Sequence, residues 1–119
     1  MASQNAQHDR RIDYIEMSAT SIPEIRTFYA KAFGWKFTDY GPEYTSFEDG
    51  RLAGGFHAGG PTGGNGVLVV IYAVDLADAE KRVRDAGGTV VKPVFDFPGG
   101  RRFHFQDPSG NELAVWSDK

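Results

Sequence analysis

The sequence predicts an α+β protein made of two β-α-β-β-β modules that follow one another along the chain. Each half opens with an apolar strand-like run, continues with apolar residues at helical spacing, and closes with three short strand-like segments. The points at which the helices begin and end also repeat, because Ser21 and Gly34 recur as Asp75 and Gly88, both 54 residues later. Two equal offsets indicate a duplicated unit.

The first module is predicted over residues 12–58. Its opening segment, residues 12–17, has the propensity of a strand. A capping box that begins at Ser21, with a proline in the first turn, marks the start of a helix that ends at Gly34. The three strands after this helix are expected at residues 35–40, 44–48 and 51–57.

The second module is predicted over residues 67–118, after a glycine-rich linker at residues 59–66. Residues 67–74 form a continuous apolar run that suits a buried strand, and Asp75 is the expected N-cap of the next helix. The linker precedes a strand and not a helix, so it lacks the helix N-terminus that a phosphate-binding loop uses. The three closing strands are expected at residues 89–95, 101–106 and 112–117.

The composition fits one cytoplasmic domain. A chain of 119 residues suits one domain, and 40% apolar residues supply a core without disulfides. The absence of cysteine excludes thiol chemistry and Cys-ligated metals. A net charge of −3 argues against a nucleic-acid partner, and no apolar run approaches the roughly 18 residues of a membrane span. Residues 1–11 are polar, lack the apolar core of a signal peptide, and are predicted to form a mobile leader.

Three short motifs, in this order, resemble the vicinal-oxygen-chelate superfamily of glyoxalases, bleomycin-resistance proteins and dioxygenases. They are residues 28–35 (FYAKAFGW) at the end of the first helix, Val74 and Asp75 before the second helix, and residues 107–111 (DPSGN) before the last strand. The match spans roughly residues 12–118. The resemblance implies that each module curls into a half-barrel sheet around a cleft. It also implies that a single-domain member forms a homodimer, in which modules can be exchanged between subunits.

The resemblance further implies four positions at which metal-dependent members hold a divalent ion with His and Glu side chains. In this sequence these positions read Tyr14, Ala53, Val69 and Ala114, with Gly54 as an alternative to Ala53. None of them supplies a metal ligand, whereas a catalytic metal normally has at least three protein ligands. No cofactor is therefore expected, and metal-dependent glyoxalase or extradiol dioxygenase activity is disfavoured. A divalent metal held elsewhere is the alternative.

Side chains that alternate along the same strands predict a ligand-binding cavity. The predicted cavity residues are Tyr14, Glu16, His57, Val69, Ile71, Glu112, Ala114 and Trp116. Glu16, His57 and Glu112 could form a displaced metal site, although two residues along a strand move a ligand by about 7 Å. Each of the three residues also has a structural interpretation. Glu16 can be a charge with a partner, His57 a surface histidine, and Glu112 a solvated charge at the end of a strand. His104 can face either side of its strand.

Three functions are compatible with these residues. The first is a metal-independent protein that binds a planar or cationic small molecule by stacking and cation–π contact, which resembles the antibiotic-sequestering branch of the family. The alternative is a glyoxalase-like lyase or isomerase, or a dioxygenase, with a non-standard metal site or a metal-free acid–base site at Glu16 or His57. The third is a structural or regulatory dimer without turnover. Neither a nucleic acid nor a membrane is expected as a partner.

Overall fold

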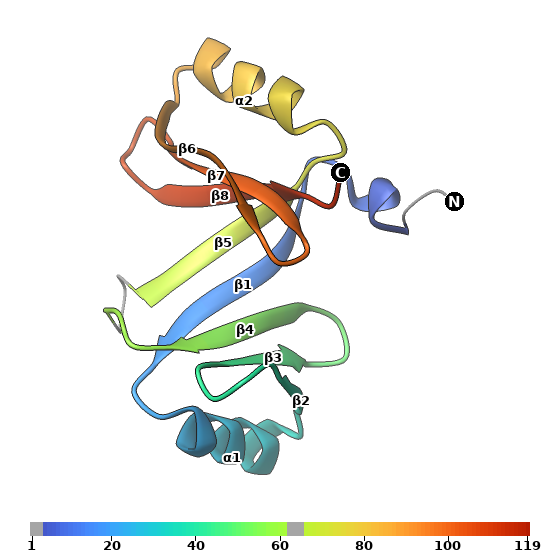
Figure 1. Cartoon of the computed structure of the whole chain (residues 1–119), viewed down its shortest axis with the longest axis vertical. Helices are drawn as coiled ribbons and strands as arrows, with labels where there is room; N and C mark the ends of the chain where they lie inside the picture. Colours follow the sequence, from blue (N-terminus) through green and yellow to red (C-terminus); the bar gives the residue numbers. More distant parts are fainter. Residues whose placement is uncertain (1–3, 62–65) are drawn as a thin grey trace. The chain divides into compact units, whose positions relative to one another are not determined.

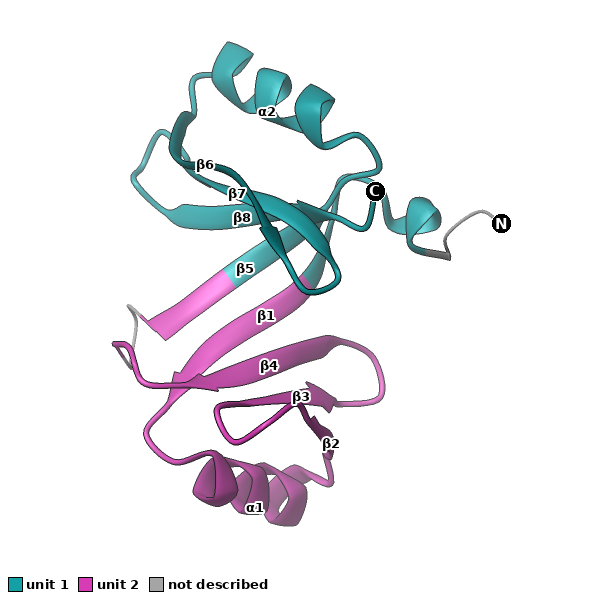
Figure 2. Ribbon diagram, in the orientation of Figure 1, with its two compact units in different colours: residues 1–13, 69–119 teal, residues 14–68 magenta. Residues whose placement is uncertain are grey.

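The computed structural model describes residues 4–61 and 66–119. Its elements are η1 (Gln4–His8), β1 (Arg11–Ala19), α1 (Ile22–Phe33), β2 (Lys36–Asp39), β3 (Tyr44–Glu48), β4 (Ala53–Ala58), β5 (Val67–Tyr72), α2 (Leu76–Asp85), β6 (Thr89–Phe97), β7 (Gly100–Gln106) and β8 (Glu112–Ser117). The chain divides into two compact units (Figure 2). Unit 1 comprises residues 1–13 and 69–119, and unit 2 comprises residues 14–68.

In unit 2, helix α1 packs against one face of a sheet with the strand order β2-β3-β4-β1 (Figure 1). Neighbours are antiparallel except β4 and β1, which are parallel. The helix begins where Ser21 Oγ accepts a hydrogen bond from the backbone N–H of Glu24, at 3.3 Å. It ends at Gly34, whose φ of 74° lies in the left-handed region that favours glycine.

The core of unit 2 is a stack of aromatic rings between α1 and the sheet. The ring centroids of Tyr29 and Trp35 lie 4.5 Å apart, and those of Trp35 and Phe47 lie 4.6 Å apart. Gly54 on β4 leaves room for this stack, because a Cβ there would overlap the Ile15 carbonyl oxygen and the Phe47 ring. The apolar face of the sheet is therefore the face that meets α1. The side chains on the opposite face do not belong to this aromatic core.

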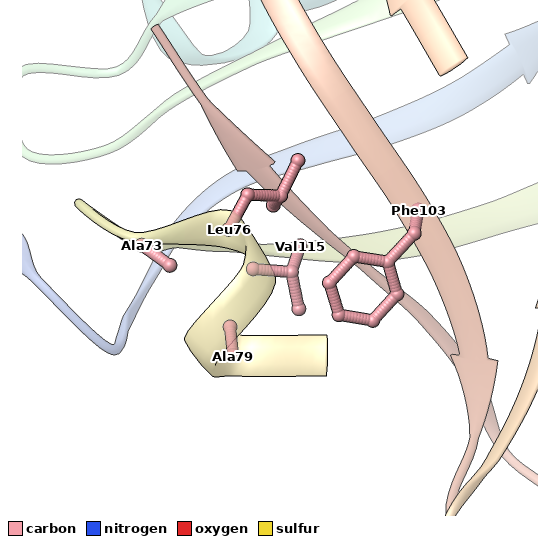
Figure 3. Packing of buried hydrophobic residues seen from close by; sticks show 5 residues of the cluster. All are labelled: Ala73, Leu76, Ala79, Phe103 and Val115. Atoms are coloured by element: carbon pink, nitrogen blue, oxygen red, sulfur yellow. The ribbon is translucent and has the colours of Figure 1, made fainter. Parts of the chain in front are cut away.

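In unit 1, helix α2 packs against a sheet with the order β5-β8-β7-β6. Strands β5 and β8 are parallel, and the other neighbours are antiparallel. Asp75 caps the helix, because its side chain accepts a hydrogen bond from the backbone N–H of Asp78 at 3.0 Å. The buried cluster shown in Figure 3 consists of Ala73, Leu76, Ala79, Phe103 and Val115.

Strand β6 lies at the end of this strand order and is irregular. Lys92 pairs with His104, and Phe95 pairs with Arg102, so the pairing register shifts between these two points. Between these two pairs, β6 advances by three residues while β7 advances by two, which is the geometry of a β-bulge. Pro93 lies in the shifted segment and has no N–H to donate to the ladder.

The segment predicted to be a mobile leader makes specific contacts in its described part. Residues Gln4–His8 form a 3-10 helix. Asp9 Oδ1 accepts a hydrogen bond from the backbone N–H of Val74 at 2.8 Å, and the backbone N–H of Arg10 donates to the Tyr72 carbonyl at 2.7 Å. These bonds tie the segment to unit 1, which differs from the expectation of a free leader.

The predicted α+β fold with two βαβββ-like modules is confirmed. The helix caps at Ser21 and Asp75 are those expected from the sequence. Residues 62–65 of the predicted linker lie outside the described residues. Within residues 4–61 and 66–119, no helix has both the length and the apolar character needed to cross a membrane.

Candidate functional site

The pairing of β1 with β4 sets which residues of unit 2 lie on the face opposite α1. Tyr14 pairs with Ala53, and Ser18 pairs with His57. Directly paired residues point to the same side of a sheet, and so do residues two apart on a strand. Glu16 therefore lies on this face together with Tyr14 and His57, as the alternation along the strands predicts.

Tyr14, Tyr44 and Glu16 form a hydrogen-bonded group on this face. The hydroxyl oxygens of Tyr14 and Tyr44 are 2.6 Å apart, and the Tyr44 hydroxyl donates to Glu16 Oε2 at 3.3 Å. Since this bond uses the Tyr44 proton, the Tyr14 hydroxyl donates to the Tyr44 oxygen. Burial is the largest cause that raises the pKa of Tyr44, and its hydrogen bond to Tyr14 and the Glu16 carboxylate raise it further. Burial also raises the pKa of Tyr14. Both phenols are therefore neutral at physiological pH.

Gly55 provides the space in which the two tyrosine hydroxyls meet. A Cβ at this position would overlap Tyr44 Oη and lie 2.7 Å from Tyr14 Oη. Any side chain at position 55 would therefore compete with the hydroxyl pair. Tyr44 was not among the predicted cavity residues, although it shares a face with His57, its partner in the β3–β4 pairing.

His57 lies beside this group and has a partner of its own. Its Nε2 and the Ser18 hydroxyl oxygen are 3.2 Å apart. The hydroxyl can donate to or accept from the imidazole, depending on the tautomer. The open face of unit 2 therefore presents two phenols, a carboxylate and an imidazole. All four residues are half-buried.

The pairing of β5 with β8 corrects two of the predicted cavity residues. Val70 pairs with Ala114, whereas Val69 pairs with Leu113 and Ile71 pairs with Val115. Val115 belongs to the buried cluster under α2, and Ile71 packs against that cluster. Val69 and Ile71 therefore lie on the α2 side of the sheet, away from the face that carries Ala114.

The same register places Tyr72 beside Trp116 on the face opposite α2. Trp116 is half-buried, and its indole N–H donates to Asp13 Oδ2 at 3.0 Å. The Arg102 guanidinium lies over the ring of Phe97, 5.6 Å from its centroid, and the Phe97 and Trp116 rings are 6.2 Å apart. This face of unit 1 is therefore aromatic, with charged groups held at its rings.

His104 is a buried polar residue on this face of unit 1. Only 3% of the residue is exposed, and its Nδ1 is 2.9 Å from Glu112 Oε2. Ala114 pairs directly with His104 across β7 and β8. Burial lowers the pKa of His104, and the cations Arg102 and Lys92 lower it further, while the hydrogen bond to Glu112 opposes the shift. His104 is therefore a neutral imidazole near pH 7.

The sequence left open which way His104 points, and the alternation along β7 decides it. Phe103 is fully buried in the cluster under α2, and Phe105 packs against the same cluster. His104, between them, must point to the other face. The alternation of Phe103, His104 and Phe105 is visible in the sequence. It shows the direction of His104 only once the two phenylalanines are known to face α2.

A family metal does not fit the residues at the expected positions. Tyr14 and Ala53 pair with each other, whereas Ala114 pairs with Val70 and the expected position Val69 pairs with Leu113. Hydroxyl, methyl and isopropyl groups supply no adequate set of ligands for a divalent ion. Among the residues the structure describes, no group of three or more His, Cys, Asp or Glu side chains could hold one.

The proposed displaced set gains no support from these contacts. Glu16 accepts a hydrogen bond from Tyr44, and His57 is bonded to Ser18. Glu112 belongs to unit 1 and contacts His104.

A pocket of about 430 Å³ lies on the α2 side of unit 1. Its apolar lining includes Ala73, Ala79 and Val115, which also belong to the buried cluster in Figure 3. The charged groups Asp78 and Arg82 at the same pocket pair with each other, with Arg82 Nε 2.6 Å from Asp78 Oδ2. The pocket therefore lies on the opposite side of the sheet from His104, and two of its charged groups are paired with each other.

Comparison with known proteins identifies the family. A model described as the Glyoxalase/Bleomycin resistance protein/Dioxygenase superfamily matches residues 11–115. The chain is 32% identical to the anthracycline biosynthesis protein DauV of Streptomyces sp. (strain C5) over 124 residues, which cover 87% of this chain and 45% of that protein. The chain thus spans less than half the length of this curated relative.

Solved structures of low identity share the fold. A superfamily member from Vibrio splendidus 12B01 is 15% identical, with a TM-score of 0.70 over 90% of this chain and 97% of that chain. The Mn(II)-bound glyoxalase from Novosphingobium aromaticivorans is 20% identical, with a TM-score of 0.68 over 93% of this chain and 40% of that chain. The family indicated by the three motifs is thereby confirmed: the chain belongs to the glyoxalase/bleomycin resistance protein/dioxygenase superfamily.

Proposed function

We propose that this chain binds a planar or cationic small molecule on the open sheet face of unit 2 and does so without the metal used by metal-dependent relatives. The observation that carries the proposal is the Tyr14–Tyr44–Glu16 group. Tyr14 stands at the position where the family places its first metal ligand, and its hydroxyl is bonded to Tyr44 at 2.6 Å. Phenols and a carboxylate at this place suit hydrogen bonding to a ligand better than metal coordination.

The charge of this group favours a cationic partner. Glu16 accepts a hydrogen bond from Tyr44 and stays half-buried, so a carboxylate lies beside two neutral phenol rings. A ligand ammonium group would gain a charge-assisted hydrogen bond from the carboxylate and cation–π contact with the rings. The two phenol rings, whose hydroxyls meet at 2.6 Å, also offer an aromatic surface for a flat ring system.

The relative named for anthracycline biosynthesis supports this ligand class. It is 32% identical to this chain over the matched region. Anthracyclines combine a planar fused-ring chromophore with an amino sugar, which are the two features that the aromatic and carboxylate groups would recognise. Daunorubicin is therefore a suitable first probe, and its own fluorescence reports binding.

The test is a titration of daunorubicin with the purified protein at pH 7, followed by ligand fluorescence with and without EDTA. We expect saturable binding that EDTA leaves unchanged. Glu16→Gln removes the charge and keeps the shape, and should weaken binding about fivefold to tenfold, as for a charge-assisted bond. Glu24→Gln, an exposed glutamate in the first turn of α1, is the matched control and should bind like wild type.

Two results would contradict the proposal. One is the absence of binding by daunorubicin and by a panel of flat cationic dyes. The other is binding that EDTA abolishes and that manganese, nickel or zinc restores, because it would require a metal site built from other groups. The same metals added alone should leave the melting temperature unchanged, since a ligand that binds the native state raises it.

A homodimer belongs to the same proposal. Phe28 and Phe33 on α1 are 55% and 67% exposed, and their rings are 6.5 Å apart. Adjacent exposed aromatic side chains favour an interface, since isolated ones are normal and clustered ones are not. Sedimentation velocity should give a dimer for the wild type and a monomer for the Phe28→Ser, Phe33→Ser double variant. A monomeric wild type would contradict this part of the proposal.

A further inference from the structure

His104 has one nitrogen that the structure leaves without a partner. The residue is 3% exposed, and Nε2 is buried with no hydrogen-bond partner in the described structure. The other ring nitrogen, Nδ1, is 2.9 Å from Glu112 Oε2. A buried polar atom without a partner is uncommon in native proteins, and an external group is one way of completing its hydrogen bonding.

The contact with Glu112 decides what Nε2 can do. An ionised carboxylate only accepts hydrogen bonds, so Nδ1 must carry the proton of the 2.9 Å bond. The imidazole is neutral near pH 7 because burial lowers its pKa. Nε2 therefore carries a lone pair and is an acceptor. Its missing partner must be a donor.

The charged groups around His104 favour a donor that is weakly acidic. Glu112 on β8 holds Nδ1, while Arg102 on β7 and Lys92 on β6 place positive charge near the ring. A hydroxyl whose oxygen carries partial negative charge is stabilised by such cations. The Phe95 ring, with its centroid 5.8 Å from that of His104, adds a flat apolar neighbour. A phenolic hydroxyl combines these properties.

The strands that flank His104 differ on its two sides. Ala114, its direct partner on β8, has only a methyl group. On the other side, β6 is bulged between Lys92 and Phe95, beside His104. Bulges at the rim of a sheet re-aim side chains and are frequent beside active sites. Movement of the bulged segment, which contains Pro93, would open Nε2 to a ligand.

We propose that His104, oriented by Glu112, is a ligand-recognition residue whose Nε2 accepts a hydrogen bond from a phenolic hydroxyl of the bound molecule. This inference rests on the proposed small-molecule binding and names the group that the protein recognises. His104 lies directly beside Ala114, and its Nε2 supplies a polar atom that the alanine side chain lacks. No proton is transferred in this step, and the phenol keeps its hydrogen.

The test compares 1-naphthol with 1-methoxynaphthalene, which has the same ring system without the donor. Wild-type protein should bind naphthol about tenfold more tightly, equivalent to about 1.4 kcal/mol. His104→Phe keeps a flat ring and removes the acceptor, so the preference should fall to within about twofold. His8→Phe, at an exposed histidine of η1, should keep the tenfold preference.

A spectroscopic measurement on wild-type protein keeps the test independent of whether the variant folds. The ¹⁵N resonance of His104 Nε2 should lie in the range of an unprotonated nitrogen and should move when naphthol is added, but not with the ether. Equal affinity for the two compounds, or a proton found on Nε2 at pH 7, would overturn the inference and leave the proposed function standing. Failure of both naphthalenes and of daunorubicin to bind would overturn both.

Discussion

The hydroxyl oxygens of Tyr14 and Tyr44 lie 2.6 Å apart in the space that a side chain at position 55 would fill. The two rings reach this point from β1 and β3, on either side of β4, which carries Gly55. The glycine is thus required by the close approach of two side chains and not by its own backbone conformation. This relationship supplies the first of three predictions on stability.

Gly55→Ala should destabilise unit 2. The new Cβ would overlap Tyr44 Oη and lie 2.7 Å from Tyr14 Oη, so the hydroxyl pair must separate or the rings must leave their rotamers. Overpacking of this kind costs about 1–3 kcal/mol. Urea denaturation measures the change in the free energy of unfolding. Ser46→Ala, at the β3 partner of Gly55, is the control: it removes only an exposed hydrogen bond of 3.4 Å to the Thr38 carbonyl and should change the free energy of unfolding by about 0.5 kcal/mol. A Gly55→Ala variant as stable as wild type would refute the packing argument.

Tyr44→Phe should flatten the loss of stability at alkaline pH. Burial raises the pKa of Tyr44 above its ordinary value of 10.0. The unfolded chain therefore loses this proton first, and the stabilisation present below pH 10.0 is lost as the pH rises above it. One such group contributes a slope of at most about 1.4 kcal/mol per pH unit.

Thermal unfolding between pH 8 and 11 measures this effect. The melting temperature of wild type should fall more steeply above pH 10 than that of Tyr44→Phe. The two proteins are compared by slope, because loss of the hydrogen bonds to Tyr14 and Glu16 also lowers the variant's stability at every pH by about 1 kcal/mol. Parallel curves would mean that the Tyr44 phenol titrates normally in the folded protein.

His104→Phe should flatten the loss of stability at acid pH. The pKa of His104 is lowered from its ordinary value of 6.5, chiefly by burial and then by Arg102 and Lys92, against the opposing hydrogen bond to Glu112. As the pH falls below 6.5, the unfolded chain takes up the proton before the folded one does, so wild type loses stability through this window.

The measurement is the free energy of unfolding from urea titrations at steps from pH 7.5 to pH 5. The wild-type values should decline toward pH 5, and the His104→Phe values should decline less. Direct titration of the His104 ring by NMR gives the same information without a variant. A ring that becomes charged at or above pH 6.5 would contradict the burial argument.

The order of the elements could be predicted from the sequence because local signals fix it. Ser21 and Asp75 are caps whose side chains bond the first turn of each helix, and Gly34 ends α1 with the positive φ that favours glycine. The alternation along β1 likewise placed Tyr14 and Glu16 on one face. These signals depend on neighbours within a few residues, so they do not need the tertiary structure.

The face of β5 could not be predicted in the same way. Residues 67–74 are a continuous apolar run, and a strand without alternation does not show which side chains meet the helix. Val70, and not Val69, pairs with Ala114, so Val69 and Ile71 lie on the opposite face of the sheet from Ala114. The bond between His104 and Glu112 also escaped prediction, because it depends on the register of β7 against β8.

Gly55 in unit 2 and Ala114 in unit 1 are small residues in similar surroundings. Gly55 pairs with Glu16 on β1, and Ala114 pairs with Val70 on β5, and these two partners are 54 residues apart. At Gly55 the space is taken by tyrosine hydroxyls from the flanking strands, and Ala114 lies beside the imidazole of β7. Both small residues therefore have polar side chains of neighbouring strands beside them.

The filled space above Gly55 has a consequence for the surface of unit 2. Because two phenol oxygens occupy it, position 55 cannot present a side chain of its own, and the hydrogen-bonding groups beside this part of β4 come from β1 and β3.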